Sequence, residues 1–104
     1  MSIKTWGGKS DFEYDGCAML GVRIHYGNQK PIVVSKADFK KLCAAFLGGV
    51  IKVGASKTVA PVGSLGEWLQ NNVTKTAIAS YVAPILVREG YAIKESSTEI
   101  RVIR

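Results

Sequence analysis

Three acidic residues near the start of the chain alternate with aromatic ones and could bind a divalent cation. Asp11, Glu13 and Asp15 lie two residues apart, so in a β-strand their side chains share one face. Such a row of carboxylates suits a metal-dependent nuclease. No lysine follows at the spacing that a nuclease core needs, however. We therefore favour a solvated acidic strand face, which discourages pairing with other chains.

The two cysteines and the single histidine offer little to a nucleophilic or metal centre. Cys17 and Cys43 lack the Cys-x-x-Cys spacing, and with His25 they supply only three of the four ligands of a zinc site. A cysteine nucleophile would need His25 as its base, and nothing in the sequence places them together. We therefore expect no metal, no cofactor and no catalytic residue, and we predict that the protein is not an enzyme.

The composition is that of a globular protein with a basic surface. The 104 residues, 47% hydrophobic and 21% charged, fit one domain and exclude a mostly disordered chain. Fourteen Lys and Arg against eight Asp and Glu give a net charge of +6, which is typical of domains that bind nucleic acid or an acidic partner. The alternative is a basic surface that serves solubility alone. Trp6 could stack on a base or equally cover the edge of the core.

No apolar run approaches the roughly 18 residues that a membrane span needs. The first 16 residues also lack the apolar stretch of a secretory signal. We therefore expect a cytoplasmic protein with no membrane contact.

The first third of the chain predicts a small sheet. Residues 1–10 show no periodicity and are expected to be irregular. Residues 11–15 alternate between acidic and aromatic side chains, which predicts a strand with its aromatic face buried. Residues 19–34 predict a β-hairpin, with its turn at residues 27–30.

A helix should follow directly. Ser35 can cap it, an apolar stripe runs along it, and Gly48 ends it. Residues 50–53 then predict a short strand, and the glycines, serine and proline of residues 54–63 predict a loop.

Two further helices are expected. One runs from Ser64 to Asn72, and its serine and the glutamate three residues later have the spacing of a capping box. The other is predicted over residues 75–89. Pro84 lies inside it and removes one backbone hydrogen bond, so we expect a kink there or a break near Ala83.

The order of the elements from residue 36 onward carries the most information. It is helix, short strand, short helix, tight turn, longer helix and a hairpin formed by residues 91–94 and 99–103. Residues 64–82 look like a helix-turn-helix. In residues 85–91 a glycine separates the last helix from the next strand. In this order and spacing the chain resembles the winged helix-turn-helix superfamily of DNA-binding domains.

The resemblance covers residues 36–104. It implies an α+β fold, a winged helix-turn-helix, to which residues 1–35 add an N-terminal β-hairpin extension. We expect the whole chain, residues 1–104, to form a single domain.

The resemblance also implies that the third helix and the final hairpin contact double-stranded DNA. A helix with small residues on its outer face fits the major groove, and a hairpin can touch the backbone or the minor groove. The helix carries no arginine or asparagine that could read a base with two hydrogen bonds. The residues expected to contact DNA are Lys75, Thr76, Ala79, Ser80, Ala83, Lys94, Ser96, Ser97 and Arg101.

The function that the resemblance implies is that of a small transcriptional regulator or an accessory DNA-binding factor. Dimerisation is common among winged-helix regulators, so a homodimer is a further expectation. The alternative is a non-catalytic module for protein interaction or homodimerisation. A helix face of Thr, Ala and Ser also suits a protein contact, and a fold does not fix a function.

Overall fold

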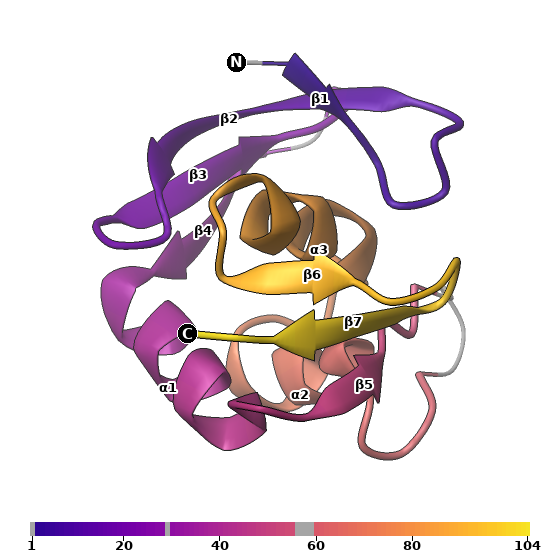
Figure 1. Cartoon of the computed structure of the whole chain (residues 1–104). Helices are drawn as coiled ribbons and strands as arrows, with labels where there is room; N and C mark the ends of the chain where they lie inside the picture. Colours follow the sequence, from indigo (N-terminus) through magenta and orange to yellow (C-terminus); the bar gives the residue numbers. More distant parts are fainter. Residues whose placement is uncertain (1, 29, 56–59) are drawn as a thin grey trace.

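The computed structural model describes residues 2–28, 30–55 and 60–104. Within these residues it is an α+β fold with a four-stranded antiparallel sheet, a second sheet of three strands and three helices (Figure 1). The elements are β1 (Ser2–Lys4), β2 (Asp11–Cys17), β3 (Gly21–His25), β4 (Ile32–Ser35), α1 (Lys36–Phe46), β5 (Val50–Lys52), α2 (Leu65–Asn72), α3 (Ala79–Arg88), β6 (Ala92–Lys94) and β7 (Glu99–Val102). In the described segments no helix has both the length and the apolar character needed to cross a bilayer.

The N-terminal sheet has the strand order β1-β2-β3-β4. The predicted alternation in β2 is confirmed, with aromatic side chains buried and acidic ones exposed. The expectation that residues 1–10 are irregular is wrong, because β1 pairs with β2 and places Ile3 opposite Phe12. A strand of three residues with a single apolar side chain is too short to show a period. The buried residues of the sheet are Phe12, Tyr14, Val22, Ile24 and Val34.

Strand β2 continues past its predicted end at Asp15 because Gly16 stays in the ladder, opposite Val22. Gly16 has φ +88°, and a Cβ atom there would lie 2.2 Å from the carbonyl oxygen of Gly21. Only glycine fits this close approach without strain. The tight turn that follows brings β3 back along β2.

The N-termini of α1 and α2 are capped by serine, as the sequence predicted. The Ser35 hydroxyl accepts a hydrogen bond from the Asp38 amide, and the Asp38 carboxylate accepts one from the Ser35 amide, which completes a capping box. In α2 the Ser64 hydroxyl caps in the same way, but the Glu67 side chain accepts from the Gly63 amide instead. These caps fix where both helices start.

The second sheet has the strand order β5-β7-β6 and contains the predicted C-terminal hairpin. Its strands lie within the ranges that the sequence indicated. Part of the predicted loop at residues 54–63, and one residue of the predicted turn at 27–30, lie outside the described residues.

Helix α3 begins later than predicted. The expectation of a helix from Lys75 is wrong, because the first helical residue is Ala79. The Thr74 hydroxyl accepts from the Thr76 amide at 3.4 Å, a local turn that competes with the helix. Of the two alternatives expected at Pro84, a kink or a break near Ala83, the break does not occur, because the helix runs through Pro84.

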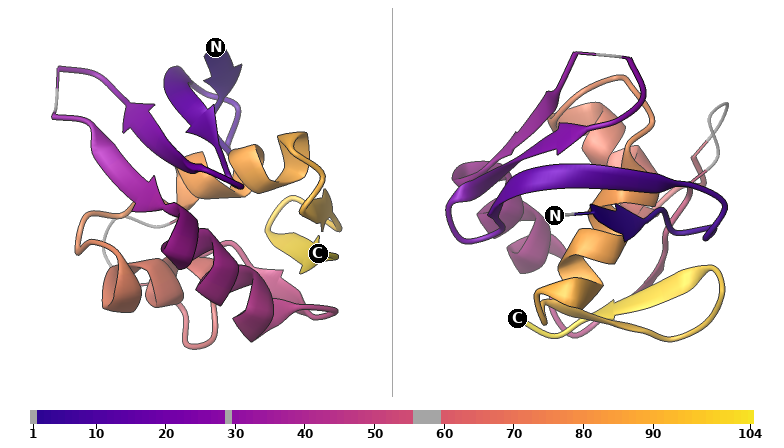
Figure 2. Two further views of the ribbon diagram at one scale, coloured as in Figure 1. Left: turned by 90° about the vertical axis from the view of Figure 1, so that its left-hand side faces the viewer. Right: turned by 90° about the horizontal axis from the view of Figure 1, so that it is seen from above.

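The apolar residues of α3 lie at the centre of the molecule. Figures 1 and 2 show the helix between the N-terminal sheet and β6. The ring of Tyr81 packs against Phe12 and Tyr26, with centroids 5.0 Å and 5.1 Å apart. Residues of both sheets join one hydrophobic cluster, from Phe12 to Val102. The predicted N-terminal extension therefore shares its core with the rest of the chain.

A carboxylate at the end of α3 joins the helix to the N-terminal sheet. Glu89 accepts hydrogen bonds from the Tyr14 hydroxyl and the Ala18 amide, each at 2.7 Å. Burial, together with this hydrogen bond, raises the pKa of Tyr14 from 10.0 to about 12. The neutral phenol is thus the form that the fold stabilises.

This shift predicts a loss of stability at alkaline pH. In the unfolded chain Tyr14 ionises near pH 10, whereas in the fold it stays protonated until about pH 12. Its contribution is complete below pH 10 and is lost as the pH rises through the folded pKa. We expect the urea midpoint of the wild type to fall more between pH 8 and pH 11 than that of Tyr14→Phe. Equal falls in the two proteins would contradict this role.

Candidate nucleic-acid interface

The small residues of α3 do not form an outer face. Ala79 is 2% exposed and Ala83 is 0% exposed, so the prediction that they contact DNA from the helix surface is wrong. Ser80 is partly buried, and its carbonyl accepts a hydrogen bond from the Trp6 amide at 2.8 Å. Small side chains occur here because other elements pack closely against the helix.

Lys75 and Thr76 are exposed, but they precede the helix. They precede the N-terminal end of α3, whereas Arg88 is the last residue of this helix, which is about 15 Å long. The structure therefore does not place them with the basic residues at the C-terminal end of α3.

Two of the predicted hairpin residues meet at Trp6. The Lys94 ammonium group lies 5.0 Å from the centroid of the Trp6 ring, a cation–π contact. The indole Nε1–H of Trp6 donates to the Ser97 carbonyl at 2.7 Å. Ser96 instead donates its hydroxyl to Glu99, and Arg101 forms an ion pair with Glu95. The structure thus places Lys94 and Ser97 in one cluster around Trp6. The charge of Arg101 is neutralised by Glu95.

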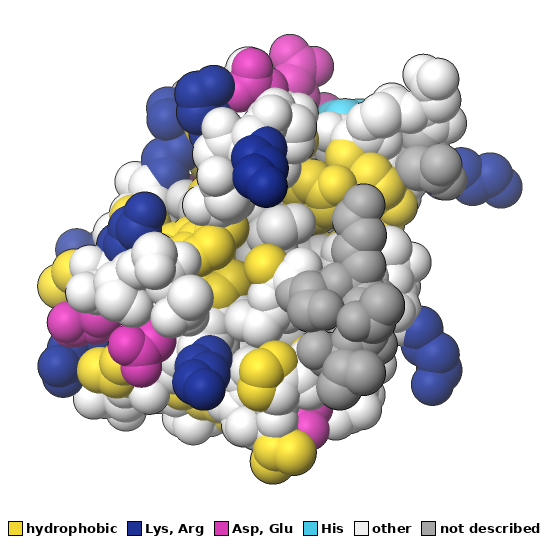
Figure 3. Space-filling view, turned by 90° about the vertical axis from the view of Figure 1, so that its right-hand side faces the viewer, with side chains coloured by type: hydrophobic (Ala, Val, Ile, Leu, Met, Phe, Trp, Pro, Cys, Tyr) yellow, Lys and Arg dark blue, Asp and Glu magenta, His cyan; other side chains and the backbone are white. Residues whose placement is uncertain are grey.

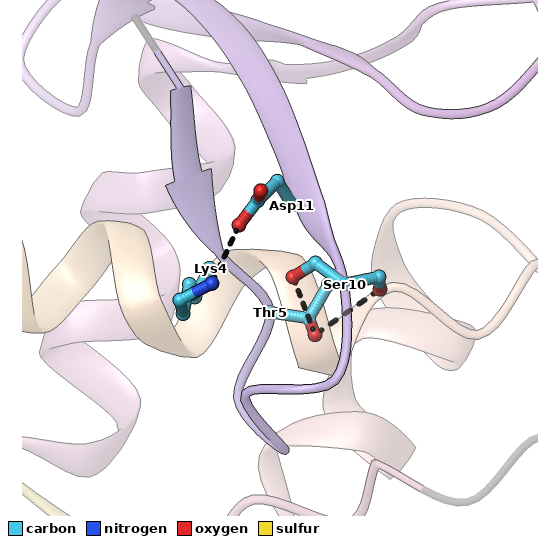
Figure 4. A network of polar contacts seen from close by, with 4 residues as sticks. All are labelled: Lys4, Thr5, Ser10 and Asp11. Carbon is cyan, nitrogen blue, oxygen red and sulfur yellow. Dashed lines mark hydrogen bonds and ion pairs between the residues drawn. The ribbon is translucent and has the colours of Figure 1, made fainter.

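Trp6 is the residue of this cluster that the predicted set omitted. Its backbone and side chain hold the N-terminal segment against both α3 and the β6–β7 turn. A tight turn supports it: the Thr5 amide and hydroxyl both donate to the Ser10 carbonyl, and the Lys4 ammonium group pairs with Asp11 at 3.1 Å (Figure 4). No sequence periodicity could have connected Trp6 to these partners. The only signal was an aromatic residue beside glycines in a basic chain.

A shallow hollow of about 380 Å³ lies beside Trp6. We call it the Trp6 hollow. Arg88 and Lys94 contribute cations, Thr5 contributes a hydroxyl, and no lining residue is acidic. Such a site attracts an anion. The lining residues are Ile3, Thr5, Trp6, Pro84, Val87, Arg88 and Lys94.

Acidic side chains lie on the N-terminal sheet and also at the β6–β7 turn, where Glu95 pairs with Arg101 and Glu99 accepts from Ser96. Figure 3 shows the side of the molecule with the β6–β7 turn, where Lys and Arg side chains are spread over the face and Asp and Glu side chains lie at the upper edge, at the left and near the lower edge. Asp11, Glu13 and Asp15 are exposed on the outer face of the N-terminal sheet, and His25 lies 2.8 Å from Asp15. Within the described residues, no group of three His, Cys, Asp or Glu residues could hold a metal ion. This acidic face would repel phosphates.

The contact between Trp6 and Ser80 predicts a specific response to Pro84→Ala. Proline has no amide hydrogen, so in the wild type the Ser80 carbonyl is free to accept from Trp6. Alanine would supply a helical donor to the same carbonyl. We expect the Trp6 amide to exchange its hydrogen faster in the variant, by NMR, while the Gly8 amide, bonded within its own turn, serves as control. Unchanged exchange at Trp6 would count against the coupling.

Comparison with known proteins gives no relative for this chain. No family model, curated protein or solved structure matches it. The function must therefore be argued from the geometry and charge of the described residues.

Proposed function

We propose that this protein is a non-catalytic DNA-binding protein that contacts the phosphates of a duplex through the Trp6 hollow and the adjoining β6–β7 turn. The observation that carries the proposal is the placement of Arg88 and Lys94 in one hollow that has no acidic residue in its lining. The net charge of +6 adds a favourable long-range attraction.

The packing of the Trp6 ring favours binding of a duplex over binding of a single strand. Its ring packs against the core, and the ammonium group of Lys94 lies 5.0 Å from its centroid, so an unpaired base would have to displace Lys94 to stack there. Ala79 and Ala83 of α3 are buried, so they cannot contact the edges of the bases. Contacts to phosphates remain, and these give affinity with little sequence preference. An accessory DNA-binding factor fits this better than a regulator of one operator.

The order of elements supports the winged-helix resemblance. After the N-terminal sheet, the chain runs α1-β5-α2-α3-β6-β7, and β6 and β7 form the hairpin in the position of a wing. We propose a winged-helix-like unit in which the wing, rather than α3, meets DNA. Cys17 and Cys43 are free thiols, which supports the expected cytoplasmic location.

Binding to a random-sequence duplex tests the proposal. We expect Lys94→Ala and Arg88→Ala each to weaken binding for all sequences alike, measured by fluorescence anisotropy over a range of salt concentrations. Each variant should also make the log–log salt dependence shallower by about one unit, because one phosphate contact is lost.

Two matched variants control this experiment. Lys52→Ala removes an exposed strand lysine of the same sheet, which lies opposite Glu99. Lys41→Ala removes an exposed lysine of α1, which does not line the Trp6 hollow. Both should leave duplex affinity nearly unchanged. If Lys52→Ala weakens binding as much as Lys94→Ala, or if the single strand binds as tightly as the duplex, the proposed interface is wrong.

A further inference from the structure

A second groove lies along α1, and its lining contains none of the residues of the Trp6 hollow. We call it the α1 groove. It has a volume of about 360 Å³ and opens between α1, the β2–β3 turn, the residue before β6 and the last residue of the chain. Its lining residues are Ala18, Met19, Lys36, Phe39, Lys40, Cys43, Ala44, Leu47, Tyr91 and Arg104.

The groove follows the helix axis. Lys36, Lys40, Ala44 and Leu47 recur at spacings of three and four residues, so they form one stripe on α1. The eleven residues of α1 give the stripe a length of about 16 Å. An occupant therefore needs an elongated contact surface of about this length.

The edges of the groove are apolar and open to solvent. Met19 is 66% exposed and Leu47 is 60% exposed. A small ligand in a protein pocket normally has most of its surface buried. A small ligand inside this groove would leave Met19 and Leu47, its two largest exposed apolar side chains, uncovered. An occupant that covers Met19 and Leu47 must bring an extended surface of its own, as a peptide does.

The charges at the rim define that surface further. Lys36 and Lys40 are cations, and no side chain that lines the groove is acidic. Glu89 bonds to the neighbouring Ala18 amide, but it also accepts from Tyr14 and is committed to the fold. A bound partner would therefore gain from carboxylates beside the part of its surface that lies over Lys36 and Lys40.

We propose that the α1 groove binds an acidic amphipathic helix of a partner protein. The apolar stripe of the partner would pack on Phe39, Ala44 and Leu47, and its Asp and Glu side chains would face Lys36 and Lys40. An apolar floor gives no donors to a phosphate backbone, so this site is distinct in chemistry from the proposed DNA surface. The proposal for the α1 groove does not depend on whether the protein binds DNA.

A labelled synthetic peptide serves as the probe. It has about 12 residues, which makes about three helical turns, with Leu at positions i, i+3, i+4 and i+7 and Glu on both flanks. A second peptide carries Lys in place of each Glu. We expect the Glu peptide to bind the full-length protein in fluorescence anisotropy, and the Lys peptide to bind at least about tenfold more weakly.

Two pairs of neighbouring residues on α1 give matched variants. Ala44 and Ala45 are both exposed, but only Ala44 lines the groove, so Ala44→Glu should weaken peptide binding about tenfold or more and Ala45→Glu should not. Lys40 and Lys41 are likewise both exposed, and only Lys40 lines the groove. Lys40→Gln should weaken binding, and Lys41→Gln should not.

The same measurements can overturn the proposal. Failure of the Glu peptide to bind, equal binding of the Lys peptide, or equal effects of Ala44→Glu and Ala45→Glu would each do so. Saturable binding of dodecanoate that Ala44→Glu abolishes, without peptide binding, would make the groove a small-ligand site. A wild-type dimer in sedimentation that Ala44→Glu converts to monomer would make a second copy the occupant. Either result would show that the occupant of the α1 groove is not an acidic helix of a partner protein.

Discussion

A carbonyl oxygen without a helical donor determines how the N-terminal segment meets the rest of the molecule. Pro84 cannot donate to Ser80 four residues earlier, and an unpaired carbonyl next to the core would be costly. The amide of Trp6 supplies the missing hydrogen bond. Once Trp6 is fixed there, its ring and indole N–H reach Lys94 and Ser97. The turn that contains Trp6 is therefore held against both α3 and the β6–β7 hairpin.

This arrangement separates two kinds of surface. The Trp6 hollow combines cations with groups that the fold already holds in place, which suits a rigid contact with phosphates. The α1 groove is apolar at its centre and basic only at its rim, which suits a folded segment of another protein. The two linings share no residue, so occupation of one leaves the side chains of the other free. If both proposed sites are occupied, the two ligands contact different side chains.

The sequence correctly predicted those elements that depend on residues close together in the chain. The alternation of β2 and the capping serines of α1 and α2 were correct because each depends on residues a few positions apart. The start of α3 was wrong because Thr74 can either cap a helix or close a turn, and its sequence does not distinguish them.

The site was predicted less well than the fold. Lys94 and Ser97 were predicted and lie together, but Ala79 and Ala83 were placed on the wrong face. Small side chains look alike in a sequence whether they face solvent or a closely packed neighbour. The contact of Trp6 with Ser97 joins residues 91 positions apart, which no local pattern reveals.

This separation also sets a delay during synthesis. Trp6 is synthesised early and Ser97 late, and at 5–20 residues per second the interval between them is roughly 5–20 s. Tyr81 can reach Phe12 only once residues 79–88 have been synthesised, so the aromatic face of the N-terminal sheet lacks this neighbour for most of that interval.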